Sequence, residues 1–180
     1  MTEILLSSEK FIKGNSNISD NVAGKYILAA LRQAQEVHLR AILGDCLLEA
    51  LKGKVADGTL ADQYQALVDR SQYFLMHQTC AIVGNMVTYK VGNFGVAKSS
   101  DENLQPVTQD EVAKQQFFYQ SMADAEAIRV QRFVWENKGA FPELTACDCS
   151  RIQRALGVTT DIFLGGPRGK ILPGGGGCCK

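Results

Sequence analysis

The sequence lacks an excess of charge of either sign, because 19 lysines and arginines balance 19 aspartates and glutamates over 180 residues. A protein that holds nucleic acid through its phosphates depends on such an excess, so we expect any DNA contact to be transient and non-specific. Long apolar runs are also missing, since no stretch approaches the roughly 18 residues that span a bilayer. Residues 1–7 carry no basic segment typical of a signal sequence. These absences predict a cytoplasmic protein with no membrane partner.

Histidine is scarce as well. His38 and His77 are the only two, and each stands alone on a predicted helix without a legible catalytic partner. The run from Gly165 to Lys170 suggests a phosphate-binding loop, but it lacks the Ser or Thr after the lysine and the spacing of that motif. We therefore predict no catalytic, cofactor-binding or metal-binding residues, and a protein that is not an enzyme.

Helix-start and helix-stop signals are what the sequence does contain. Ser19 or Asp20 is placed to cap a first long helix, and Gly44 supplies its stop. Asp45 then caps a short second helix, which we expect to run from Cys46 to Leu51. The fold class that follows is all-α, a bundle of about four main helices.

The third and fourth helices are also long. Thr59 or Asp62 begins the third, and the capping box formed by Thr108 and Glu111 places the start of the fourth. Gly139 stops the fourth helix. Apolar residues at helical spacing predict the core that the four helices share. The expected core residues are Tyr26, Ala30, Val37, Leu67, Phe74, Phe117, Met122 and Phe133.

A long inter-helix loop separates the third and fourth helices. Gly92 and Gly95 flank Asn93 and Phe94, and two glycines at this spacing cannot continue a helix. The polar run that follows, as far as Pro106, is longer than the connections usual in helix bundles. A bundle has no folding reason to carry such a loop, so we expect it to contact another molecule.

The C-terminal part of the chain has a different composition. We divide the chain into a helical domain, residues 1–145, and an extension with a flexible glycine-rich tail, residues 146–180. Within the extension, Arg151–Leu156 suits one short helix and Val158–Leu164 suits a strand. Basic residues exceed acidic ones there, which suggests docking to a charged partner. The candidate docking residues are Arg168, Lys170 and Lys180.

Four cysteines in the extension offer an alternative function. Cys147 and Cys149 form a Cys-x-Cys pair, and Cys178 and Cys179 are adjacent. Zinc sites usually use Cys-x(2–4)-Cys pairs, so this spacing is a poor match. The alternative reading is a cytoplasmic metal- or thiol-dependent binding module.

Three groups of residues resemble the head–tail connector proteins (neck or adaptor proteins) of tailed phages and prophages, especially those of gut bacteria. They are the segments Ile18-Ser19-Asp20-Asn21-Val22 with Tyr26-Ile27 and Ile42-Leu43-Gly44-Asp45, the turn Lys90-Val91-Gly92-Asn93-Phe94-Gly95-Val96, and the stop Phe141-Pro142-Glu143-Leu144. The resemblance covers roughly residues 3–145.

The resemblance implies a structural subunit of the virion neck, assembled in the host cytoplasm. Copies would form a homo-oligomeric ring beneath the portal protein and join it to a tail-completion protein, with DNA passing through the lumen. The subunit and portal interface expected under this reading comprises Gly92, Asn93, Phe94, Gly95, Val96, Leu104 and Pro106.

Overall fold

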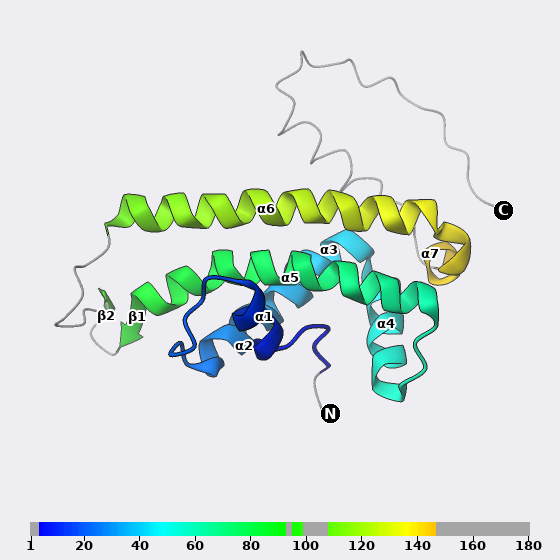
Figure 1. The fold of residues 1–180 in the computed structure, drawn as a ribbon, viewed down its shortest axis with the longest axis horizontal. Coiled ribbons are helices and arrows are strands. Elements are labelled where there is room, and N and C mark those ends of the chain that lie inside the picture. Colours follow the sequence, from blue (N-terminus) through cyan, green and yellow to red (C-terminus); the bar gives the residue numbers. More distant parts are fainter. Residues whose placement is uncertain (1–3, 93–94, 99–107, 147–180) are drawn as a thin grey trace, which may run out of the picture.

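Two long helices organise the fold. The computed structural model describes residues 4–92, 95–98 and 108–146. Helices α5 (Asp62–Thr88) and α6 (Gln109–Glu136) run side by side in opposite directions along the molecule (Figure 1). The N-terminal helices pack mainly against α5, and one of them also reaches α6. The fold is therefore an all-α bundle, as the sequence predicts.

The remaining helical elements are short. Before α5 the chain forms α1 (Glu9–Asn15), α2 (Gly24–Gln33), the π-helical segment η1 (Ala34–Leu39), α3 (Arg40–Leu43) and α4 (Asp45–Asp57). After α6 it forms the 3-10 turn η2 (Lys138–Ala140) and α7 (Glu143–Ala146). Helix α3 contacts α6, and α4 contacts α7.

The first long helix begins later than expected. Ser19 and Asp20 do not cap it; α2 starts at Gly24, and Ala23 precedes it without a side-chain cap. The Ser19 hydroxyl instead accepts a hydrogen bond from the backbone N–H of Asn21 at 3.3 Å, which closes a local turn. The carboxylate of Glu9 lies beside Gly24, where its charge is favourable at the amino end of a helix.

A buried glutamine connects the π-helical segment to the extended residues at the start of the chain. Gln35 is fully buried in η1, and its Oε1 accepts a hydrogen bond from the N–H of Leu6 at 2.8 Å. Its Nε2 donates to the carbonyl of Ile4 at 2.9 Å. A π segment widens the helix by one residue per turn, and here the widened turn carries the residue that anchors residues 4–6.

Glycines end the helices before α5. Gly44, with a φ of 80°, separates α3 from α4 as predicted. Helix α4 continues beyond the expected end at Leu51 and stops at Gly58, which takes the left-handed conformation with a φ of 65°. Gly53 lies inside the helix, because no left-handed residue interrupts it there.

The start of α6 agrees with the sequence. Thr108 is the N-cap, and its hydroxyl accepts a hydrogen bond from the N–H of Glu111 at 3.4 Å. The Glu111 carboxylate in turn accepts one from the N–H of Thr108 at 2.9 Å. The capping box therefore satisfies two backbone donors at the end of the helix that would otherwise lack partners.

The other end of α6 is fastened by an aromatic contact. Phe141 is fully buried and meets the ring of Tyr64 edge-on, with 5.1 Å between ring centroids. The Tyr64 hydroxyl donates to the carboxylate of Glu143 at 2.8 Å. Burial and this carboxylate raise the pKa of Tyr64 to about 12. The start of α5 is thus joined to α7.

Part of the expected core is correct and part is wrong. Ala30, Leu67 and Phe74 are buried, and Tyr26 and Phe133 pack partly buried against the same cluster. The prediction fails for three residues that face outward. They are Val37, Phe117 and Met122, with 57%, 75% and 38% of their surface exposed. Each lies on a helix at core-like spacing, but its side chain is on the outer face of that helix.

A network of charged side chains joins the first helical stretch to α4. Arg40 pairs with Glu36, with Glu49 at 2.6 Å and with Asp45 at 3.0 Å. Lys52 pairs with Glu36 at 2.5 Å. Partial burial opposes ionisation of Glu36, but hydrogen bonds from Lys52, Arg40 and Gln35 outweigh it and lower its pKa to about 2. The network fixes the angle of the corner at Gly44.

Phe74 and Phe117 form a matched pair for testing the core, because one is 3% exposed and the other 75%. Phe74→Ala should lower the free energy of unfolding by about 3–5 kcal/mol, since it leaves a cavity in the core. Phe117→Ala should change it by no more than about 0.5 kcal/mol. Urea denaturation of both variants measures this. Equal losses in the two would contradict the assigned faces of α5 and α6.

Glu36→Gln should destabilise the protein at neutral pH by roughly 1 kcal/mol, a modest value because solvent screens this partly exposed network. The folded-state pKa of Glu36 lies below its ordinary value of 4.5, so its contribution is complete above pH 4.5 and is lost as the pH falls towards about 2. Denaturation at several pH values should show the two proteins converging over that interval. Asp57→Asn, on the exposed end of α4, is the control. A difference that persists unchanged at low pH would contradict this account.

Candidate assembly interface

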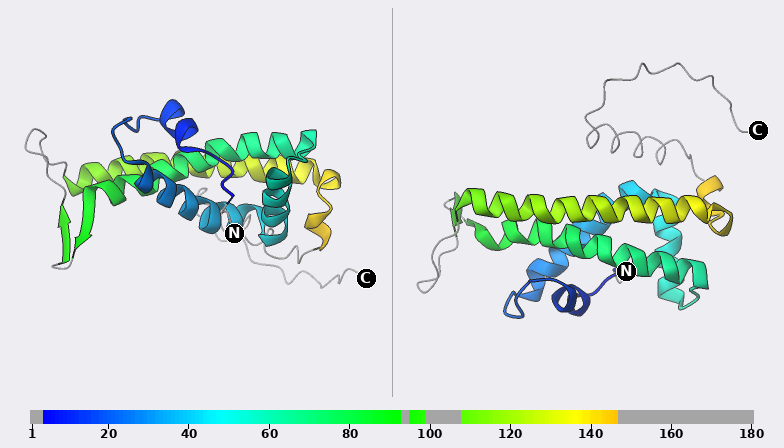
Figure 2. Two further views of the ribbon diagram at one scale, coloured as in Figure 1. Left: turned by 90° about the horizontal axis from the view of Figure 1, so that it is seen from below. Right: turned by 45° about the horizontal axis from the view of Figure 1, so that its top comes forward.

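A β-hairpin stands at the end of the helix pair. Strand β1 (Tyr89–Gly92) continues directly from α5, and β2 (Gly95–Lys98) returns antiparallel to it. Gly92 pairs with Gly95, next to the connection at residues 93–94. The hairpin projects away from the helices at the end opposite α4 and α7 (Figures 1 and 2). The start of the expected loop is therefore an ordered hairpin, which sequence reasoning missed.

Among the residues that the structure describes, this hairpin forms a sheet of two strands. Its main contact with a helix is with α5, from which it continues. A two-stranded hairpin is marginally stable by itself in water, and its outer edges present N–H and C=O groups that can pair with another strand. The hairpin is therefore suited to binding a further chain.

The structure brings together three of the interface residues predicted from the sequence. Gly92, Gly95 and Val96 all lie in the hairpin, with Val96 opposite Val91 in the register. The other predicted interface residues lie outside the described residues; they are Asn93, Phe94, Leu104 and Pro106. The candidate docking residues Arg168, Lys170 and Lys180 also lie outside them.

Sequence reasoning missed a second surface, on α6. Large apolar side chains face away from α5 and α3 along this helix, and we call them the outer face of α6. They are Phe117, Phe118, Met122, Ile128 and Trp135. Trp135 remains 59% exposed although the ammonium of Lys138 lies 5.0 Å from its ring. A signal was present, because α6 carries two apolar stripes where one is enough to face α5.

The two histidines lie near carboxylates of α6. Burial lowers the pKa of His38, and the carboxylate of Asp124 opposes that shift. Burial also lowers the pKa of His77, opposed by Glu126. His77 packs beside Tyr119, with 6.3 Å between ring centroids. Both histidines are thus partly buried side chains at contacts between helices.

The described residues contain no metal-binding cluster. No group of three or more His, Cys, Asp or Glu side chains is placed to hold an ion within residues 4–92, 95–98 and 108–146. Cys80 is buried with a free thiol, whose pKa is raised by burial. The cysteines of the alternative reading lie outside the described residues; they are Cys147, Cys149, Cys178 and Cys179.

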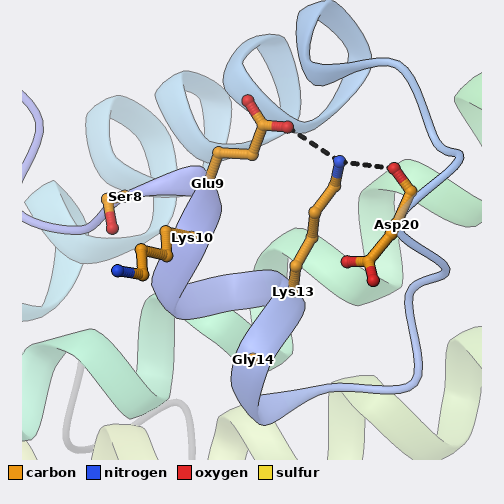
Figure 3. A pocket seen from close by; sticks show the side chains of 6 residues that line it. All are labelled: Ser8, Glu9, Lys10, Lys13, Gly14 and Asp20. Atoms are coloured by element: carbon orange, nitrogen blue, oxygen red, sulfur yellow. Dashed lines mark hydrogen bonds and ion pairs between the residues drawn. The ribbon is translucent and has the colours of Figure 1, made fainter.

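A shallow hollow lies beside α1, and charged side chains line it (Figure 3). Lys13 points across it between two oxygens, and its Nζ lies 2.8 Å from the Glu9 carboxylate. The same Nζ donates to the backbone carbonyl of Asp20 at 2.8 Å. Lys13 therefore connects α1 to the loop before α2.

One family model matches the part of the chain that carries both surfaces. A family model described as a family of unknown function, DUF6712, matches residues 39–154, more than half of the chain. The chain belongs to this family. No curated protein and no solved structure matches it. The DUF6712 match includes the hairpin and the whole outer face of α6.

Helix length and hydropathy give one further fact about this DUF6712 member. Among the residues that the structure describes, no helix combines the length and the apolar character needed to cross a membrane.

Proposed function

We propose that this protein is a structural subunit of the head–tail connector of a tailed phage. In this role copies form a ring beneath the portal protein in the virion neck, join it to a tail-completion protein and surround the channel through which DNA passes. The sequence motifs that resemble connector proteins suggest this role. The structural feature that carries the proposal is the hairpin at the end of the α5–α6 pair, whose strand edges are unpaired among the residues that the structure describes.

The geometry suits assembly into a ring. A ring needs a heterologous contact, in which one surface of a subunit meets a different surface of the next. The hairpin lies at one end of the elongated helix pair, while α4 and α7 form the other end (Figure 1). Each copy can therefore reach a neighbour through the hairpin without using the same patch on both partners.

The charge balance is consistent with a DNA channel. Lysines and arginines equal aspartates and glutamates in number, so the formal net charge is zero. A strongly basic lumen would hold the phosphates of the DNA tightly. A subunit without net charge allows the DNA to slide past with transient, non-specific contacts.

The register of the hairpin identifies the backbone groups available to a neighbour. A two-residue connection closes on a hydrogen-bonded pair, here Gly92 and Gly95. Successive pairs in an antiparallel ladder alternate between facing inward and facing outward. The next pair, Val91 and Val96, therefore directs its backbone N–H and C=O groups to the outer edges of the hairpin.

Val96→Pro should abolish assembly while leaving the bundle folded. Proline removes the outward N–H of residue 96 and leaves the inward hydrogen bonds of the hairpin in place. Val96→Ala keeps that N–H and is the matched control. The measurement is native mass spectrometry and electron microscopy of each protein mixed with the portal protein from the same genome.

Rings or portal complexes formed by the wild type and Val96→Ala, but not by Val96→Pro, would support the proposal. A wild-type protein that stays monomeric and ignores the portal would overturn it. Normal assembly by Val96→Pro would remove the hairpin edge from the mechanism. Thermal unfolding of the three isolated proteins separates a lost contact from a lost fold.

A further inference from the structure

Charged side chains are missing from part of the amino-terminal half of α6. Between Lys114 and Asp124 nine consecutive residues, 115–123, carry no charge, and we call them the uncharged stretch of α6. Helix α5 runs beside it and contains no Lys, Arg, Asp or Glu over residues 71–88. A surface helix normally carries charged residues on the side that faces water. The hairpin end of the helix pair therefore differs from an ordinary protein surface.

Large apolar side chains of this stretch are exposed. Phe117 is 75% exposed, Phe118 58% and Met122 38%. The stretch is packed on its inner side, where Tyr119 and Ala123 are buried. Aromatic residues and methionine are enriched at the centres of protein–protein interfaces, and charged residues are depleted there. The exposed side of the stretch therefore has the composition of an interface centre.

Polar side chains of the stretch have partners within the subunit. The Ser121 hydroxyl donates to the carbonyl of Phe117 at 2.9 Å. The side-chain amide of Gln120 donates to the carboxylate of Asp124 at 3.0 Å. A buried polar group is costly when it lacks a hydrogen bond, and these two groups keep theirs when the surface is covered. Covering the stretch is therefore compatible with its polar residues.

The charges at the two limits of the stretch indicate which molecule covers it. Lys114 precedes the stretch and Asp124 follows it, and each lies five residues from Tyr119. Where two copies of α6 cross antiparallel at the middle of the stretch, residue 114 of each copy lies at the level of residue 124 of the other. Opposite charges then match at both limits of the contact. We propose that two copies of this chain associate through the uncharged stretch, about a twofold axis.

A twofold contact places particular demands on a surface. The same patch is used on both partners, so it has to be complementary to itself. A patch without charge meets its own copy without repulsion, whereas nucleic acid would require basic side chains. This contact joins copies in pairs and does not use the strand edges of the hairpin. The inference therefore does not depend on the connector role.

Sedimentation velocity of the full-length protein at increasing concentrations tests the contact. The wild type should pass from monomer to dimer as the concentration rises. Phe117→Gln combined with Phe118→Gln should weaken the dimer about tenfold or more, because buried aromatic residues supply much of the binding energy at an interface. Trp135→Gln is the matched control. Trp135 is also an exposed aromatic residue of α6, but it lies outside the uncharged stretch, so its replacement should leave the dissociation constant unchanged.

Charge reversal tests the antiparallel arrangement. Lys114→Glu should weaken the dimer roughly fivefold, because acidic side chains then lie at the same level at both limits of the contact. Adding Asp124→Lys to the same chain should restore the affinity, since opposite charges again match across the axis. A general loss of packing would not be rescued by a second substitution. Far-UV circular dichroism of each variant checks that the bundle is folded.

A wild-type protein that remains monomeric at every concentration would overturn the proposal. Equal dissociation constants in the wild type and the Phe117/Phe118 variant would also contradict it, because association would then use another surface. Failure of the double charge reversal to restore affinity would exclude the antiparallel twofold arrangement. No portal protein is present in these measurements, so their outcome is separate from that of the Val96→Pro experiment.

Discussion

The antiparallel packing of α5 on α6 is the contact on which the rest of the structure depends. Helix α5 is enclosed by α6 on one side and by α2 and η1 on another, so its buried residues lie around most of its circumference. Leu67, Phe74 and Leu75 are buried there beside the polar residues Ser71 and Thr79. The N-terminal helices acquire their positions by packing on α5, and the hairpin acquires its position because it continues α5.

Polar pairs across this contact select its register. Gln78 and Gln120 exchange hydrogen bonds at 3.2 Å, and Asn85 donates to Gln116 at 3.1 Å. A helix pair held only by apolar side chains can slide by a turn at modest cost, whereas a shifted register would leave the buried amide of Gln78 without its partner. The amide pairs therefore also fix how far the hairpin extends beyond α6.

The sequence predicted those features that depend on neighbouring residues alone. The capping box at Thr108 and the stop at Gly44 are local signals, and both are confirmed. The cap at Ser19 or Asp20 is wrong because α2 begins only at Gly24, and the Ser19 side chain stabilises a turn that precedes the helix. The expected end of the second helix at Leu51 is wrong, because it is Gly58 that adopts the left-handed conformation that ends α4.

Features that depend on tertiary packing could not be predicted in the same way. Phe117 and Met122 have the spacing of core residues, but periodicity alone does not say which of two apolar stripes on α6 faces α5. The hairpin was missed because it is short and its glycines resemble those of an irregular loop. Of the candidate interface, the sequence located Gly92, Gly95 and Val96, but not the outer face of α6.

The hairpin and the outer face of α6 are close together at one end of the molecule and far apart at the other. Phe117 lies eight residues into α6 and thus about 12 Å from the end that faces the hairpin. A neighbour bound to the hairpin can therefore also touch Phe117 and Phe118. Trp135 lies a further 27 Å or so along the helix, beside the last described turn of the chain. Contact with the hairpin and contact with Trp135 are therefore separate events unless a neighbour extends along most of α6.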